Sequence, residues 1–159
     1  GGPLMHVVAA KAIAFGEALR PEFKEYQRRV LENAQALAES LIARGLHLVS
    51  GGTDNHLMLV DLRKQHPEVT GARAETWLGQ AGIIVNKNMI PYDERKPMET
   101  SGLRLGTPAL TTRGLGIDEM RRIATMFDRV LAGKGDKAAI EKTRSEVLEI
   151  CAQFPVPQH

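Results

Sequence analysis

Residues 4–19 predict a helix that carries apolar residues on nearly every side. The sequence is L-M-H-V-V-A-A-K-A-I-A-F-G-E-A-L, and its apolar surface is interrupted mainly by His6 and Lys11. Pro3 precedes it and favours a helix start, because proline already has a helical φ and the first turn needs no N–H group from it. A helix that is apolar all round has to be buried on all sides. The other residues of this chain are poorly able to bury it, so we expect this helix to pack against a body of protein outside residues 21–159.

Pro21 ends or kinks this helix. After it, the apolar residues lie on one side of the predicted helix, and helical segments are mixed with strand segments. Apolar residues at steps of three and four predict an amphipathic helix from Glu22 that stops at Gly45. Two strands joined by the turn residues G-G-T-D-N predict a hairpin. The strands are expected at residues 46–50, 56–62, 83–85 and 103–105, and further helices at 71–81 (capped by Thr70), from about 118 to Gly133, and at 136–152. The sequence therefore predicts an α/β fold, an α+β sandwich of three or four short strands with helices on one side.

Composition and charge exclude several classes of partner. The 21 Lys and Arg residues stand among 19 Asp and Glu residues and leave a net charge of +2, a pattern typical of solvated helix faces and not of nucleic-acid binding. No run approaches the ~20 apolar residues of a membrane helix. We therefore expect no nucleic-acid or membrane partner.

The cysteine and histidine residues predict no redox or metal chemistry. Cys151 is the single cysteine, which excludes an internal disulfide and is typical of a reducing compartment, so we expect a cytoplasmic protein with a packed thiol. The five histidines show no metal-ligand spacing, so no metal site is predicted. His56, in N-H-L-M-L, is interpreted as a packed or hydrogen-bonded strand residue.

Arg104 lies between two leucines in the segment T-S-G-L-R-L-G-T-P-A-L-T, where we expect a buried strand. A guanidinium stays charged and is seldom buried without a partner. The residues alone leave two alternatives: an anionic ligand, or an internal acid such as Asp61 or Glu99. Glycines at positions 102 and 106 allow another group to approach the backbone closely.

Residues 86–100 predict a long irregular loop, N-K-N-M-I-P-Y-D-E-R-K-P-M-E-T. Loops of this length in compact domains are usually disordered or functional. Its two prolines, tyrosine and Asn-Lys-Asn are not typical of a disordered segment, so we expect an ordered, functional loop.

Four segments, in this order, resemble the C-terminal part of serine hydroxymethyltransferase: G-G-P-L-M-H-V-V-A-A-K-A, S-G-G-T-D-N-H-L-M-L-V-D-L, V-N-K-N-M-I-P-Y-D and T-S-G-L-R-L-G-T-P-A-L-T-T-R-G. The resemblance implies an aspartate-aminotransferase type (fold type I) pyridoxal-phosphate enzyme, whose small domain has a mostly antiparallel sheet. It implies that residues 1–20 are the terminal helix of a large cofactor-binding domain and that residues 21–159 are the small C-terminal domain. The implied reaction interconverts serine plus tetrahydrofolate with glycine plus 5,10-methylenetetrahydrofolate.

The resemblance also implies roles for individual residues. Arg104 corresponds to the arginine that receives the α-carboxylate of serine or glycine, and Asn88 to the asparagine that hydrogen-bonds the pteridine ring. The alternative for Asn88 is an asparagine that holds a left-handed turn. The remaining implied site residues are Lys96, Pro97 and Met98, where the family often has a folate-contacting Ser-Pro-Phe, and Gly1 and Gly2, which match the glycines that bind the cofactor phosphate of a neighbouring subunit.

The Schiff-base lysine of the family follows a Thr-rich stretch ending in His-Lys, and no lysine of this chain matches it. We therefore expect these 159 residues alone to be inactive, with the complete protein a homodimer or higher homo-oligomer. Two other hypotheses remain: the small domain of another fold type I enzyme, such as an aminotransferase or threonine aldolase, and a free-standing binding module.

Overall fold

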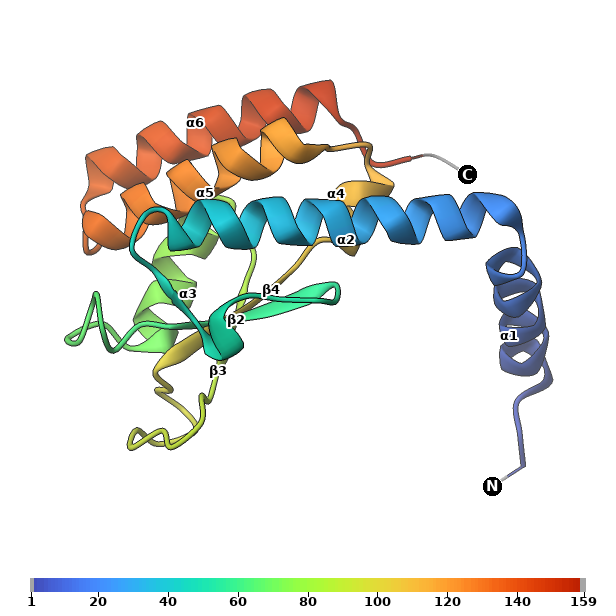
Figure 1. Ribbon diagram of the computed structural model, residues 1–159, viewed down its shortest axis with the longest axis horizontal. Helices are drawn as coiled ribbons and strands as arrows, with labels where there is room; N and C mark the ends of the chain where they lie inside the picture. Colours follow the sequence, from blue (N-terminus) through green and yellow to red (C-terminus); the bar gives the residue numbers. More distant parts are fainter. Residues whose placement is uncertain (1, 158–159) are drawn as a thin grey trace.

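A computed structural model describes residues 2–157 of the chain (Figure 1). In chain order the elements are α1 Met5–Ala18, α2 Pro21–Ile42, β1 His47–Leu48, the 3-10 turn η1 Val49–Gly51, β2 Leu57–Asp61, α3 Gly71–Gln80, β3 Asn86–Asn88, β4 Gly102–Gly106, α4 Pro108–Thr112, α5 Ile117–Ala132 and α6 Lys137–Gln153.

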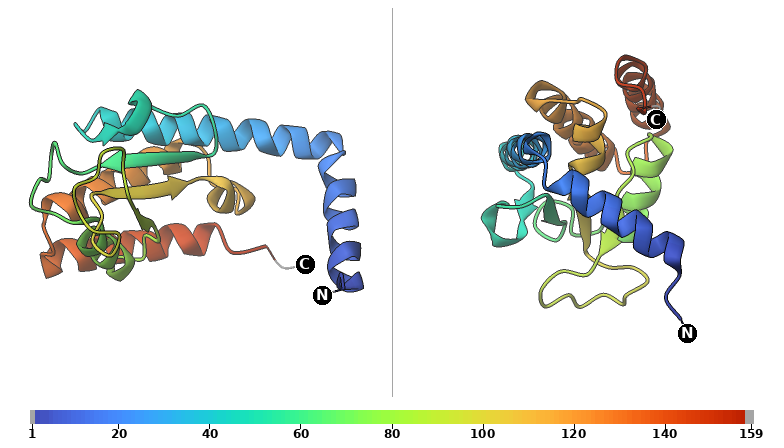
Figure 2. Two further views of the ribbon diagram at one scale, coloured as in Figure 1. Left: turned by 90° about the horizontal axis from the view of Figure 1, so that it is seen from below. Right: turned by 90° about the vertical axis from the view of Figure 1, so that its right-hand side faces the viewer.

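The four strands form one sheet in the order β1-β2-β4-β3, and every neighbouring pair is antiparallel. Helices α2, α5 and α6 lie on one side of this sheet, and the loop between β3 and β4 extends from the other side (Figures 1 and 2). The predicted α/β fold, with an antiparallel sheet and helices on one side, is confirmed.

Side-chain alternation along β2 and β4 divides the sheet into a covered face and an open face. Met58 and Val60 of β2, and Leu103 and Leu105 of β4, are buried against the helices. Successive strand residues point to opposite faces, so the residues between these four point away from the helices. The covered face is completed by helix residues that include Leu37, Leu41, Met120, Phe127 and Leu131.

The prediction of a strand at residues 83–85 is wrong, because these residues connect the end of α3 to β3. The backbone N–H of Ile83 donates to the Leu78 carbonyl at 2.8 Å, and Gly82 has a φ of +84°. Ile84 is 83% exposed, and pairing with β4 begins only at Asn86. Residues 86–88, expected in the long loop, therefore form the edge strand β3. The one-turn helix α4 and the turn η1 were not predicted either.

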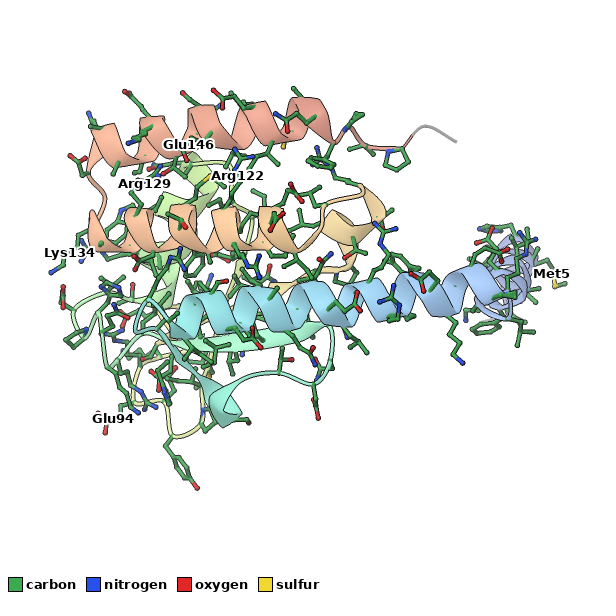
Figure 3. All side chains as sticks on the ribbon, turned by 45° about the horizontal axis from the view of Figure 1, so that its top comes forward. Met5, Glu94, Arg122, Arg129, Lys134 and Glu146 are labelled. Carbon is green, nitrogen blue, oxygen red and sulfur yellow. The ribbon has the colours of Figure 1, made fainter. Side chains whose placement is uncertain are left out.

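Helix α1 has no buried residue. It turns away from α2 at Pro21, where α2 begins, and projects from the body of the domain with Met5 near its outer end (Figures 1 and 3). Phe15 is 68% exposed and Ile13 is 65% exposed. The expected apolar surface is thus present, and residues 21–157 leave it uncovered.

No helix within residues 2–157 combines the length and the apolar character that crossing a membrane requires.

The start of α3 packs against the segment that leads into β4, and this contact generates a stability prediction. A Cβ on Gly71 would lie 2.6 Å from the Gly102 carbonyl and still closer to the Thr100 hydroxyl, whereas one on Gly79 would meet nothing within 4 Å. Gly71→Ala should lower the free energy of unfolding by about 1–3 kcal/mol through overpacking. Gly79→Ala should raise it by about 0.5–1 kcal/mol, because alanine loses less backbone freedom in a helix. Denaturant unfolding of both variants checks this, and equal effects would show that the crowding at Gly71 is not real.

Candidate functional site

Arg104 lies in the middle of β4 on the open face of the sheet, and its side chain is exposed. The expectation that it is buried is therefore wrong. The physical reason is that helices cover only one face, which the flanking leucines occupy, and strand alternation places Arg104 on the other face.

No internal acid neutralises Arg104 among residues 2–157. Asp61 is engaged by Arg63, whose Nη2 lies 2.9 Å from the Asp61 Oδ2, and Glu99 is exposed and forms no ion pair within the described chain. Burial by itself would raise the pKa of Asp61, but the hydrogen bonds and charge of Arg63 outweigh it and hold this pKa below its ordinary value. The internal-acid alternative is thus not supported by the structure, and the guanidinium of Arg104 faces outward.

Arg104 and Asn88 share one open depression of about 460 Å³ on the sheet. They come from neighbouring strands: Asn86 pairs with Arg104, and Asn88 pairs with Gly102. Residues on one face of a sheet that are diagonal neighbours lie roughly 7–8 Å apart, which is within reach of a long side chain. The depression is lined by Asn55, His56, Leu57, Met58, Leu59, Asn88 and Arg104.

Asn88 is partly buried at the end of β3, and its amide keeps capacity for a ligand. Its Nδ2 donates to the Met89 carbonyl at 2.7 Å. A second N–H and the carbonyl oxygen of the amide are not used within residues 2–157, so a donor and an acceptor stand side by side. Asn88 is not among the residues with positive φ. The alternative of a left-handed turn at this asparagine is therefore wrong.

Lys96, Pro97 and Met98 lie in the loop that follows β3 and do not line the depression. All three are exposed, Met98 by 77%. The Lys96 carbonyl accepts from the N–H groups of Glu99 and Thr100 at 2.9 and 3.0 Å, which makes this part of the loop a tight turn. The structure therefore does not place them in the depression that Asn88 and Arg104 line.

Gly1 lies outside the described residues, and Gly2 is exposed before α1. A Cβ on Gly2 would meet nothing within 4 Å. Residues 2–157 therefore form no cradle for a phosphate at this position.

The loop between β3 and β4 is ordered by two arginines, as its composition led us to expect. Arg63 donates to the carbonyls of Tyr92 at 3.1 Å and Pro91 at 3.4 Å. Arg95 donates to the Val69 carbonyl at 2.7 Å and to the preceding loop, at the Pro67 carbonyl, at 2.6 Å. These bonds hold the loop against residues 61–69 and fix one border of the open face.

His56 is a site residue that the sequence interpretation missed. It was expected to be packed or hydrogen-bonded within a strand, but it is exposed, lies just before β2 and lines the depression. Its carbonyl accepts from the Thr107 N–H at 3.2 Å, and its ring makes no hydrogen bond within residues 2–157. The apolar run L-M-L-V after His56 conceals which face each residue occupies, and this is why its position was missed.

The other ionisable clusters are not arranged as a metal site. Within residues 2–157, no three His, Cys, Asp or Glu side chains are placed to hold a metal ion. His66 is buried, its Nε2 has no hydrogen-bond partner in this part of the chain, and burial lowers its pKa.

Comparison with known proteins gives two findings. A family model described as serine hydroxymethyltransferase matches residues 1–127. A curated serine hydroxymethyltransferase of Acinetobacter baylyi is 56% identical over 156 residues, which cover 98% of this chain. The chain spans 37% of the length of that relative.

Proposed function

The chain belongs to the serine hydroxymethyltransferase family, and on this basis we propose that it is the C-terminal part of a transferase that interconverts serine plus tetrahydrofolate with glycine, 5,10-methylenetetrahydrofolate and water. The observation that carries the proposal is the placement of Arg104: an exposed guanidinium without an acid partner among the described residues, in a depression that also contains Asn88.

Arg104 is proposed to bind the α-carboxylate of serine or glycine. Its planar guanidinium presents two parallel N–H groups that match the two oxygens of a carboxylate. Two such bonds fix the orientation of the amino acid as well as its affinity. In the complete enzyme, pyridoxal phosphate would supply the electron sink for the bond that breaks at Cα. By orienting the amino acid, Arg104 would determine which Cα bond is placed for cleavage.

Asn88 is proposed to hydrogen-bond the pteridine ring of tetrahydrofolate, and Lys96, Pro97 and Met98 to form an outer part of the folate wall. The unused donor and acceptor of Asn88, at the rim of the depression with Arg104, support the first assignment. The exposure of Met98 leaves an apolar side chain accessible to a ligand and supports the second.

Protein outside this chain is proposed to complete the site. Residues 1–20 are assigned to the large cofactor-binding domain and residues 21–159 to the small domain, because α1 presents apolar side chains that residues 21–157 do not cover. Gly1 and Gly2 are proposed to bind the cofactor phosphate of a second subunit, which makes the functional unit a homo-oligomer.

The isolated 159-residue chain should therefore associate through α1. Phe15→Ser and Ile13→Ser should each reduce this association, because they remove apolar area from its exposed surface. Leu148→Ser is the matched control, since Leu148 is an exposed apolar residue on α6. Light scattering measures the outcome, and a strictly monomeric parent chain would contradict the assignment of α1.

Arg104→Lys in the full-length protein should raise the Kd of glycine and serine by about 10- to 100-fold, because a point charge cannot replace a pair of charge-assisted bonds worth ~1.5–3 kcal/mol each. Arg122→Lys is the control: Arg122 is exposed on α5, in the helical layer (Figure 3), and has no ion pair within residues 2–157. Calorimetric titration with glycine checks this. Near-normal affinity in Arg104→Lys would remove the carboxylate assignment.

The folate assignment separates this function from an aminotransferase or a threonine aldolase. The full-length protein should cleave serine in a reaction that tetrahydrofolate accelerates, and Asn88→Ala should raise the KM for tetrahydrofolate about tenfold while glycine affinity stays unchanged. Formation of glycine from labelled serine, with and without tetrahydrofolate, measures this. A wild-type rate of glycine formation that does not depend on tetrahydrofolate would contradict the proposed function.

A further inference from the structure

The carboxylate of Asp93 accepts four hydrogen bonds inside the loop between β3 and β4. Its Oδ1 accepts from the Ser101 hydroxyl at 2.6 Å and from the Arg95 N–H at 3.1 Å. Its Oδ2 accepts from the Ser101 N–H at 2.8 Å and from the Ile90 N–H at 3.3 Å. Asp61 also accepts four hydrogen bonds, but all of them come from Arg63. Those of Asp93 come from three different residues, and Asp93 makes no ion pair within residues 2–157.

Three of these bonds join the two ends of the loop, because they come from Ile90 at one end and from Ser101 at the other. Ile90 follows Asn88 by two residues, and Ser101 precedes Arg104 by three. The last ladder pair is Asn88 with Gly102, so Asp93 continues the connection between β3 and β4 beyond the point where the backbone pairing stops. One side chain therefore closes the base of a loop whose two flanking strands carry Asn88 and Arg104.

The base of the loop is packed as closely as its backbone allows. Ile90 is 4% exposed and Ser101 is 2% exposed. A Cβ on Gly102 would lie 2.9 Å from the carbonyl oxygens of Asn88 and Val60, and it would also overlap the side chain of Ile90. Because this region leaves no room for a local rearrangement, a shift of the loop base would move the adjoining ends of β3 and β4.

The four hydrogen bonds favour an ionised carboxylate. Burial by itself would raise the pKa of Asp93, but the hydrogen bonds from Ser101, Arg95 and Ile90 outweigh it and lower the pKa below its ordinary value. An ionised carboxylate only accepts. An asparagine of the same shape would direct an NH₂ group at two of the four donors, so the carboxamide cannot reproduce the arrangement.

We propose that Asp93 is a positioning residue for both substrate sites: it holds β3 and β4 so that Asn88 and Arg104 face one depression. The inference rests on the proposed function, because it takes Arg104 as the carboxylate binder and Asn88 as the pteridine binder. It adds that amino-acid and folate affinity depend together on a residue that contacts neither ligand.

The test is Asp93→Asn in the full-length holoenzyme. The Kd for glycine and the KM for tetrahydrofolate should both rise about tenfold, because the side chains that bind the two ligands are displaced together. Asp118→Asn removes an exposed acid that pairs with Arg121 on α5, and it should leave both constants unchanged.

A residue with only a structural role gives a different result: a lower melting temperature or a smaller active fraction with unchanged Kd and KM. That result overturns the inference. If Asp93→Asn does not fold, Ser101→Ala is the deciding variant, because it removes one of the four donors to Asp93. Smaller, parallel rises in the Kd for glycine and the KM for tetrahydrofolate support the inference. Unchanged values of both constants overturn it. Loss of the inference is distinguishable from loss of the proposed function, since the latter would appear as a wild-type enzyme without tetrahydrofolate-dependent serine cleavage.

Discussion

The packing of helices onto a single face of the four-stranded sheet determines where the functional groups lie. Leu103 and Leu105 are buried by these helices, and the intervening Arg104 is consequently directed to the face that carries no helix. A charged side chain in the centre of a strand is costly on a buried face and tolerated on an open one. The hydrophobic core thus orients the guanidinium through the strand that carries it.

The edge strand β3, which lies beyond β4, places the side chain of Asn88 beside that of Arg104. β3 is only three residues long, and helix α3 supports it: Glu75 accepts from the Lys87 N–H at 2.8 Å. The loop that follows is held by Arg63, Arg95 and Asp93, so its path does not depend on a hydrophobic core of its own. In such a loop, hydrogen bonds to charged groups take the place of the apolar burial that orders helices and strands. Polar side chains of the loop can therefore stay exposed on the surface.

Most of the fold was predictable from the sequence, because helix caps and hydrophobic periodicity act locally. Thr70 caps α3 as expected, by accepting from the Arg73 N–H at 3.2 Å. Pro21 marks the break between the first two helices, also as expected, although α2 begins at Pro21 and not at Glu22. The strand predicted at residues 83–85 was wrong because an apolar triplet does not reveal whether its backbone pairs with a strand or connects a helix to the next strand. The burial expected for Arg104 was wrong because the local sequence shows an alternation but not which face the helices cover. His56 was missed for the same reason. Arg104 was singled out from its place in the strand, whereas the roles expected for Arg104 and Asn88 came from the family resemblance. Their proximity follows from a strand register that no local pattern specifies.

The most direct test of this account is a crystal structure of the full-length protein with pyridoxal phosphate and glycine. The account predicts that the glycine carboxylate accepts two N–H bonds from the guanidinium of Arg104, with N···O distances of about 2.7–2.9 Å. A glycine carboxylate held by another residue, with Arg104 still pointing into solvent or paired with an acid of the large domain, would contradict it.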